Sequence, residues 1–346
     1  MNRLFAFRSK TGRFSFLLPQ KTIVIVSLLL VILIAVFVLS VILGSKLISP
    51  IEVFRTVMGW GTAENALVLG TLRLPRAVLA VLAGAALSVS GALLQGIVRN
   101  PLASPDIIGI TGGAACAAVA FITYLGGAVS IKLLPAAAFT GAALVSLVIY
   151  VLAWKRGVTS TRLVLIGIGV AAATSALTML MIVLSPITAA SKAYIWMTGS
   201  IYGASWVQVY TLLPWVLLLL PVAMLYARNL NIQELGDDVA KGLGSPVQRH
   251  RFVLLFISVA LAGSAVAVVG AIGFVGLIAP HIARKLVGPS YGGLLPVAAL
   301  IGSLVLLTAD TIARTAFLPL DIPAGVFTAS VGAPFFIYLL YRSRHA

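Results

Sequence analysis

Acidic residues are scarce in this chain of 346 residues, and charged residues of either sign make up only 9% of it. A soluble globular protein carries about 25% charged residues. Together with a hydrophobic content of 61%, this excludes an ordinary soluble enzyme. The net charge of +16 would suggest nucleic acid as the partner of a soluble protein. Here the basic residues lie between long apolar runs, so we expect membrane phospholipid as the acidic partner and no nucleic acid.

Cysteine and histidine are also too few to build the usual reactive or metal sites. The single Cys116 excludes an intrachain disulfide framework and a Cys-based zinc site, and we interpret it as a small hydrophobe. The three histidines are too scattered for a metal cluster, so we expect neither catalytic residues nor a cofactor. His281 follows Pro280, and we expect it to hydrogen-bond a backbone carbonyl that the proline frees.

The sequence lacks two common means of powering transport, a phosphate loop for ATP and a carboxylate within the membrane for ion coupling. The chain has no G-x-x-x-x-G-K-[ST] motif, so it does not bind ATP by a phosphate loop. Proton- or sodium-coupled carriers commonly use a carboxylate inside the membrane. The carboxylates here are all predicted to lie in loops or near the ends of spans, with Asp106 in an inner loop. We therefore expect transport whose energy comes from a separate protein.

The apolar runs predict an all-α membrane protein with about ten transmembrane helices. A helix needs about 20 apolar residues to cross the hydrocarbon layer. The predicted spans are 22–43, 74–97, 107–128, 133–153, 161–184, 207–227, 252–271, 273–286, 294–315 and 323–341. The eighth is short and rich in Gly and Pro, which indicates a half-helix or a re-entrant segment shielded by its neighbours.

The distribution of cations predicts that both termini are cytoplasmic. Residues 1–21 form a basic segment that contains Arg3, Arg8, Lys10, Arg13 and Lys21. By the positive-inside rule this segment stays in the cytoplasm, and an even number of spans returns the C-terminus there, with Arg342 and Arg344. Residues 22–346 form one domain, because spans rich in Gly, Ala, Ser and Thr associate closely in lipid.

A weak echo between residues 76–91 and 251–270 is consistent with an inverted repeat, because the two spans are predicted to run in opposite directions. Low sequence complexity explains the echo equally well. Both interpretations stay open at this point.

The longest polar stretch after the N-terminus, residues 231–251, lies on the predicted cytoplasmic side. Asp237 and Asp238 suit the first turn of a short helix, where negative charge is favourable. Gly244 can end that helix in a left-handed conformation, and Pro246 can open the next one. The alternative is a simple solvated loop.

This stretch resembles the cytoplasmic "EAA" loop of ABC importer permeases. The matching residues are Asp237, Ala240, Leu243, Gly244, Ser245 and Gln248. The sequence departs from the general pattern, since it has Asp-Asp-Val in place of Glu-Ala-Ala. The resemblance implies a coupling loop that inserts into a cleft of a cytoplasmic ATPase subunit, so that closure of the ATPases pushes on the spans.

Three further segments, 73–110, 270–284 and 321–336, resemble signature segments of the FecCD-type permeases, the iron-siderophore and cobalamin importers. With the ten spans, the resemblance extends over most of the chain from about residue 70. It implies a cobalamin-importer-permease-like fold in the cell membrane, a second permease subunit, two ATPases and an extracytoplasmic substrate-binding protein. The second permease subunit is either another copy or a paralogue.

The stretch 196–206 is more similar to the siderophore branch, which implies ferric siderophores as substrate; cobalamin or heme is the near alternative. From a different class, the alternative is an ATP-independent channel or facilitator.

The resemblance also implies roles for residues at the two ends of the spans. Arg73 and Arg76, with Arg314, would receive acidic side chains of the binding protein; snorkelling to lipid phosphates is the alternative. Asp310, four residues before Arg314, could instead neutralise that arginine locally. At the cytoplasmic end, the polar turn at residues 159–161 would line the gate of the translocation path. The residues assigned to the path are Thr159, Ser160, Thr161, Gly167 and Gly169. Helix capping and close packing are the alternative roles of these residues.

Overall fold

The apolar runs form the long helices that their length predicts. A computed structural model describes residues 4–8, 15–44, 47–126, 128–317 and 320–343. Arg3, Lys10, Arg13 and Arg344, which entered the orientation argument, lie outside the described residues. The elements before the centre of the chain are β1 (Leu4–Arg8), β2 (Ser15–Pro19), α1 (Gln20–Ile42), α2 (Pro50–Val57), α3 (Ala63–Leu67), η1 (Val68–Arg73), α4 (Leu74–Val98), η2 (Pro105–Ile108), α5 (Ile110–Ala120), η3 (Phe121–Leu125), η4 (Ile131–Leu133) and α6 (Leu134–Ala153). The remaining elements are α7 (Ser160–Leu184), α8 (Ile187–Met197), α9 (Trp206–Leu225), α10 (Ala227–Glu234), α11 (Asp237–Gly242), α12 (Val247–Val269), α13 (Val275–Val287), α14 (Tyr291–Thr315) and α15 (Ala324–Ser343).

Each of the ten predicted spans coincides with an apolar helix, which confirms the predicted fold class. Among the described residues, seven helices are long and apolar enough to cross a membrane, and the segments Ile110–Leu125 and Ala324–Tyr338 are shorter apolar helices. The tenth is α13, whose 13 residues extend only about 20 Å. Its length agrees with the half-helix predicted for the eighth span, and its apolar residues are buried by neighbouring helices.

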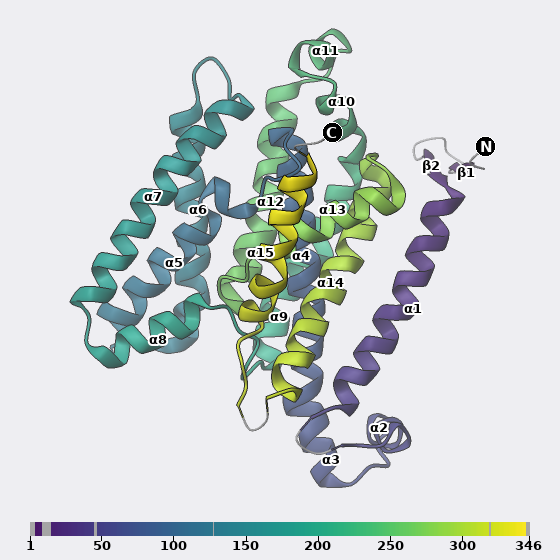
Figure 1. The fold of residues 1–346 in the computed structure, drawn as a ribbon, viewed down its shortest axis with the longest axis vertical. Coiled ribbons are helices and arrows are strands. Elements are labelled where there is room, and N and C mark those ends of the chain that lie inside the picture. The colour runs from purple at the N-terminus through teal and green to yellow at the C-terminus, as the bar shows by residue number, and fades with distance from the viewer. Residues whose placement is uncertain (1–3, 9–14, 45–46, 127, 318–319, 344–346) are drawn as a thin grey trace.

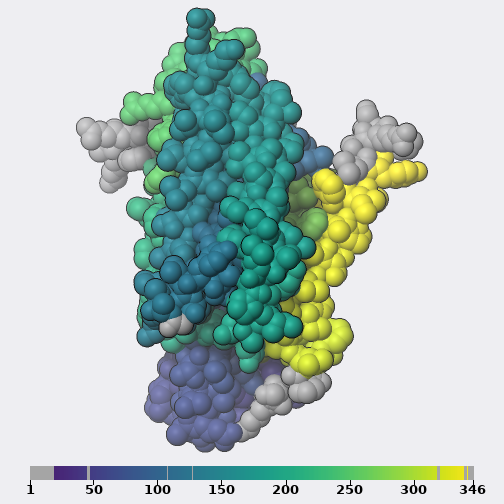
Figure 2. Space-filling model, turned by 90° about the vertical axis from the view of Figure 1, so that its left-hand side faces the viewer, coloured from purple at the N-terminus to yellow at the C-terminus, as the bar shows by residue number. Residues whose placement is uncertain are grey.

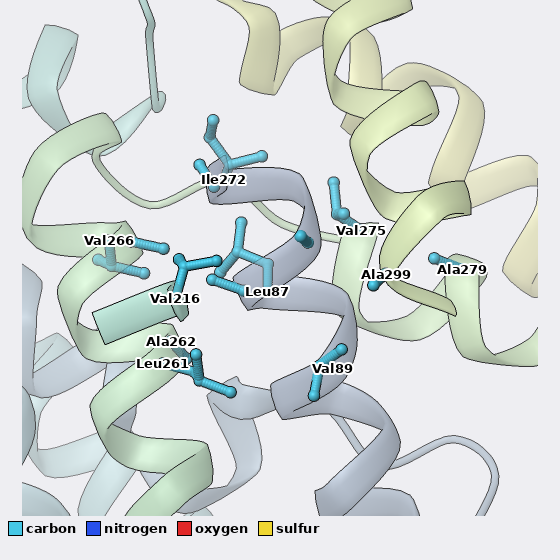
Figure 3. Packing of buried hydrophobic residues seen from close by; sticks show 14 of the residues in the cluster. Leu87, Val89, Val216, Leu261, Ala262, Val266, Ile272, Val275, Ala279 and Ala299 are labelled. Atoms are coloured by element: carbon cyan, nitrogen blue, oxygen red, sulfur yellow. The ribbon is translucent and has the colours of Figure 1, made fainter. Parts of the chain in front are cut away.

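Helix α4 lies at the centre of the bundle (Figure 1). It packs against α14, α12, α13 and α9, while α5, α6 and α7 form a group to one side and α1 packs on the outer face of α14. Buried side chains from four helices and the segment before α13 meet around the middle of α4, among them Leu87, Val216, Val266, Ile272 and Ala299 (Figure 3). The core of the molecule is thus built around a single helix.

The described chain has two distinct ends. Helix α11 lies at one end, with β1, β2 and the C-terminal part of α15, while α2, α3 and α8 lie at the opposite end (Figure 1). In side view, α2 and α3 protrude beyond the ends of α6 and α7 (Figure 2). The N- and C-terminal parts of the described chain therefore lie on the same side, as an even number of spans requires. Strands β1 and β2 pair in antiparallel fashion within the basic N-terminal segment, where no regular structure was expected.

Small residues let α4 approach its neighbours closely. A side-chain carbon at Gly91 would overlap the carbonyl oxygen of Gly276, and one at Gly84 would overlap that of Gly302. At the crossing of α4 and α12, the hydroxyl of Ser90 donates to the carbonyl of Ser258 over 2.9 Å, and the hydroxyl of Ser258 donates to the carbonyl of Ser90 over 3.2 Å. This reciprocal pair lies within the two segments that echo each other in sequence.

The second span begins earlier than predicted. Residues Ala63–Val98 form one helical stretch of 36 residues, in which η1 is a π-helix. Pro75 has no N–H to donate to the preceding turn, so a π-helical turn directly before it is a favourable way to continue the helix. Pro75 is therefore an internal position of this longer helical stretch.

The third predicted span, 107–128, is entered through a short 3-10 helix. Ser104 makes no capping hydrogen bond; Pro105 and Asp106 open the short 3-10 helix η2, and α5 begins after Gly109, whose φ is +67°. Asp106 shares a small crevice with Leu87, which is midway along α4. Asp106 thus lies in the connection between α4 and α5, as expected, and this connection comes alongside Leu87.

Candidate functional site

The polar stretch 231–251 forms the helix–turn–helix that its sequence predicts. Helix α11 begins at Asp237, with both aspartates in its first turn, and ends at Gly242. Gly244 has a φ of +78°, and the N–H of Ser245 donates to the carbonyl of Ala240 over 3.0 Å. That bond is typical of a Schellman ending, which uses a left-handed glycine. Of the two predicted structures for this loop, the short helix is confirmed.

Helix α11 has an exposed face and a buried face. Val239 and Leu243 are 52% and 64% exposed, and the side chain of Asp238 is fully exposed. Ala240 is completely buried against the bundle. An apolar side chain that water surrounds at the tip of a projection is typical of a surface that binds a partner. Of the residues matched to the EAA loop, Leu243 and Gly244 are on the exposed side of the turn.

Asp237 faces the bundle and contacts two arginines. Its carboxylate accepts from Nη2 of Arg251 over 2.9 and 3.1 Å, and it also pairs with Arg99. Arg251 lies in the first turns of α12 and is 1% exposed, whereas Arg99 follows the last residue of α4 with a φ of +56°. Asp237 thus joins the start of α11 to the ends of two central helices.

The same region holds the turn between α6 and α7. The side chain of Gln248 accepts from the N–H of Val158 over 2.9 Å and donates to the carbonyl of Val158 over 3.2 Å, and Arg251 donates to that same carbonyl. Ser245 contacts Nδ1 of His250 over 3.2 Å. Gln248 and Ser245 therefore stabilise the base of the loop, while its tip stays exposed.

A second group of side chains fixes α10 to the bundle. The side-chain amide oxygen Oδ1 of Asn231 accepts from the backbone N–H of Tyr291 over 2.9 Å. The Tyr291 hydroxyl donates to Glu234 over 3.1 Å, and Glu234 lies 3.4 Å from Arg284 of α13. Helix α11 is consequently held on two sides. On one side α10, which precedes it, is bonded to α13 and α14; on the other side Asp237 is bonded to Arg251 of α12 and to Arg99 at the end of α4.

The polar residues predicted for the gate lie close to this network. Thr159 caps α7 by accepting from the N–H of Arg162 over 3.4 Å, and the hydroxyl of Ser160 donates to the carbonyl of Ile97 over 2.8 Å. Thr161 is exposed one residue further on. Higher in α7, Gly167 is buried, whereas Gly169 is exposed and no atom lies within 4 Å of the position of a side-chain carbon there. The structure therefore places Thr161 and Gly169 on an open face and gives Thr159 and Ser160 structural contacts.

At the opposite end, the three predicted docking arginines lie together but are largely buried. Arg73 is 7% exposed and donates to the carbonyls of Val41 and Ile42, each over 2.8 Å. Arg314 donates to the carbonyl of Leu43 over 2.8 Å. Both arginines thereby satisfy carbonyls at the end of α1, where the helix leaves them without partners.

Arg76 is the centre of this arginine cluster. Its guanidinium donates to Asp310 at distances of 2.9 to 3.0 Å and to Asp321 at 2.6 and 2.9 Å. Asp310 is 1% exposed, and it lies 3.8 Å from Arg314. The pairing of Asp310 with Arg314 that the spacing allows is present, and the shorter contacts of Asp310 are to Arg76. The cluster joins α1, α4, α14 and the segment before α15.

A cavity of about 1350 Å³ lies toward the end of the molecule opposite α11. It lies between α6, α8, α9 and α12, with Trp196 and Trp215 in its wall and Lys132 and Lys192 at its margin. None of the residues predicted for the translocation path lines it. The cavity within one subunit is thus separate from the open face of α7.

His281 does not make the hydrogen bond that we expected. Neither ring nitrogen has a hydrogen-bond partner among the described residues, and the ring packs edge-on against Phe335 with the centroids 5.8 Å apart. The prediction is therefore wrong, and His281 serves as an apolar packing element.

Several connecting residues were missed by sequence reasoning. The sequence assigned no role to Arg251 or Arg99, and it indicated Asp310 only as a neighbour of Arg314. A charged residue next to an apolar run, such as Arg251 before Phe252, is the one local signal that indicates a buried ion pair. The identity of its partner depends on tertiary structure.

The comparisons with known proteins agree with this architecture. Residues 32–342 match the FecCD transport family. The chain is 50% identical, over 94% of its length and 97% of the relative, to the probable siderophore transport system permease protein YfhA of Bacillus subtilis (strain 168). It is 49% identical, over 97% of its length and 96% of the relative, to the achromobactin transport system permease protein CbrC of Dickeya dadantii (strain 3937). Among solved structures, an inward-facing conformation of a metal-chelate type ABC transporter is similar with a TM-score of 0.82 and 30% identity, covering 92% of this chain and 99% of that one. This multi-pass membrane protein belongs to the FecCD transport family.

Proposed function

We propose that this chain is the membrane-spanning subunit of an ATP-driven importer and that it carries ferric siderophores across the cell membrane into the cytoplasm. The observation that carries the proposal is α11, a short helix with an apolar tip that projects from the bundle and is tied at its base to the central helices. A projection of this kind can bind a partner and transmit its movement. The family and the siderophore permeases among the relatives supply the substrate class.

The ATPase subunit is proposed to bind the exposed side of α11, formed by Asp238, Val239 and Leu243, next to the turn at Gly244. Truncating or charging an apolar anchor at the centre of an interface typically costs about 2 kcal/mol or more of binding free energy. Leu243→Glu should therefore abolish co-purification of the ATPase. Leu235→Glu, at an exposed leucine that precedes α11, is the matched control and should keep most of the association.

The same experiment separates the two function classes that the sequence left open. A chain that keeps its uptake when no ATPase is present, or when Leu243→Glu has removed it, is an ATP-independent channel or facilitator. Loss of uptake together with loss of the ATPase supports the importer.

We propose that the arginine cluster at the opposite end, Arg73, Arg76 and Arg314, attracts acidic side chains of an extracytoplasmic substrate-binding protein. The side chains of Arg76 and Arg314 are 12% and 10% exposed, so part of each faces outward at this end of the molecule. Charge complementarity steers encounter more than it tightens a complex, and its effect falls with salt. The association rate of the binding protein should therefore decrease as ionic strength rises, and a rate independent of salt would contradict this role.

The open face that contains Thr161 and Gly169 is proposed to face a second permease subunit across the translocation path. Apolar side chains of α7 are widely exposed on this face, including Leu165, Ile168 and Leu177. Small residues there leave room for a wide substrate. Uptake of radiolabelled ferric siderophore, cobalamin and heme by vesicles with the complete complex identifies the substrate: the proposal expects the ferric siderophore alone to be accumulated.

A further inference from the structure

One buried side chain connects α11 to the α6–α7 turn, which precedes Thr161. Arg251 of α12 is 1% exposed, and its guanidinium reaches in two directions. Nη2 contacts both carboxylate oxygens of Asp237, over 2.9 and 3.1 Å, and Nη1 donates to the carbonyl of Val158. Val158 directly precedes Thr159, the capping residue of α7. A single guanidinium thus links the first residue of α11 to the last turn before α7.

The peptide at Val158 is fixed to α12 by a second residue. Gln248, one helical turn before Arg251, accepts from the N–H of Val158 over 2.9 Å and donates to its carbonyl over 3.2 Å. Both backbone groups of Val158 are therefore bonded to side chains of α12. A displacement of the first turn of α12 should therefore displace the α6–α7 turn as well, because these bonds fix the position of Val158 relative to α12.

Contacts to the end of α4 complete a ring of bonds that links α11, α12, the α6–α7 turn and α4. Asp237 also pairs with Arg99 at the end of α4, and the hydroxyl of Ser160 donates to the carbonyl of Ile97 in the last turn of α4 over 2.8 Å. When α11 moves away from the bundle, the Asp237–Arg251 pair must either stretch or move as a unit. Separation would leave the buried charge of Arg251 without its partner, which is strongly unfavourable. Movement as a unit is therefore favoured.

We infer that Asp237 and Arg251 are positioning residues that transmit movement of α11 to the α6–α7 turn, so that the path at Thr161 opens or closes with the ATPase. This inference rests on the proposed function. It assigns Asp237 an inward, transmitting role and leaves contact with the ATPase to the exposed side of α11.

The test uses the complete complex, with its ATPase, reconstituted in vesicles. Arg251→Gln and Asp237→Asn each remove the charge from one end of the link while keeping a similar shape. Both variants should retain the ATPase and continue to hydrolyse ATP, whereas the substrate taken up per ATP should fall about tenfold, within the range that coupling contacts contribute. Arg249→Gln is the matched control, since it removes an exposed arginine two residues away on the same helix, and it should change neither quantity.

A second readout follows the α6–α7 turn directly. In a Cys116→Ser background, Lys155→Cys places a thiol at an exposed position of this turn, outside the residues assigned to the path. Its rate of reaction with a water-soluble thiol reagent should change when a non-hydrolysable ATP analogue binds to the otherwise unchanged complex. The change should disappear when Asp237→Asn is added, although the ATPase remains bound.

The outcomes separate this inference from the function on which it rests. An unaltered complex that retains no ATPase, or transports without ATP, refutes the proposed function. A complex that couples normally, but whose Asp237→Asn and Arg251→Gln variants keep the unaltered ratio of uptake to hydrolysis, refutes the transmitting role alone. Loss of ATPase binding in Asp237→Asn also overturns it, because Asp237 would then be a binding contact. If Arg251→Gln fails to fold, Asp237→Asn decides the question, since Asp237 lies on a surface helix.

Discussion

Single glycines decide how closely the central helices approach. At Gly91, a side-chain carbon would overlap the carbonyl oxygen of Gly276, which belongs to the backbone of α13 and cannot move aside independently. Gly91→Ala should therefore lower stability by about 1–3 kcal/mol through overpacking. Gly292→Ala is the control, because no atom lies within 4 Å of the added carbon. Thermal unfolding in detergent measures both variants, and equal midpoints would contradict the packing argument.

The arginine cluster makes a second prediction at the scale of the residue. Arg76→Gln leaves the carboxylate of Asp310, which is 1% exposed, without its shortest ionic contacts. Breaking a buried pair in this way costs about 3–5 kcal/mol. Part of the loss should return when Asp310→Asn is added, because the unpaired charge is then removed as well.

The control for the arginine cluster is Lys132→Gln, at an exposed lysine on the same end of the molecule. This substitution should leave the free energy of unfolding unchanged within about 0.5 kcal/mol. A stable Arg76→Gln variant would show that the cluster is not a structural element of the fold.

At the scale of the element, α11 depends on the left-handed glycine that ends it. A non-glycine residue in this conformation costs roughly 1–2 kcal/mol. Gly244 has a φ of +78°, whereas Gly242 is an ordinary helical position with no neighbour within 4 Å of an added carbon. Gly244→Ala should therefore weaken co-purification of the ATPase, and Gly242→Ala should preserve it. Equal losses in the two variants would indicate that surface fit, and not the turn, governs binding.

The elements that the sequence predicts correctly are those set by local chemistry. Apolar length determines the ten spans, and the order of Asp237, Gly244 and Pro246 determines the helix and turn of the coupling loop. The π-helical stretch before Pro75 and the approach of Asp106 to Leu87 were missed. The π-helical turn is a local response to Pro75 that hydropathy does not register, whereas the approach of Asp106 to Leu87 depends on contacts between separate segments.

In the region around α11, too, the features set by local sequence could be predicted and those set by tertiary contacts could not. Its exposed side could be predicted, because Leu243 and the glycine turn form a local pattern. Its inner connections could not, because Arg251 meets Asp237 and Val158 only after α6, α11 and α12 have come together. The arginines that the resemblance grouped at one end do lie together. Their burial and their partners, Asp310 and Asp321, follow from the packing of α1, α4 and α14.

At the scale of the whole molecule, the orientation in the membrane remains a prediction that the cation distribution supports. Lys155 lies in the α6–α7 turn at the α11 end, and Lys192 lies in α8 at the opposite end; both are exposed. In a Cys116→Ser background, a membrane-impermeant thiol reagent added to intact cells should label Lys192→Cys and not Lys155→Cys. The reverse pattern would place α11 outside and remove the ATPase from reach.

The central claim is that the energy for import arrives from a separate ATPase through α11. The most direct measurement is accumulation of ferric siderophore in sealed vesicles against its gradient. Vesicles that contain the complete complex, the binding protein and ATP should accumulate the substrate, and vesicles that contain this chain alone should not. Uphill accumulation by this chain alone would contradict the account.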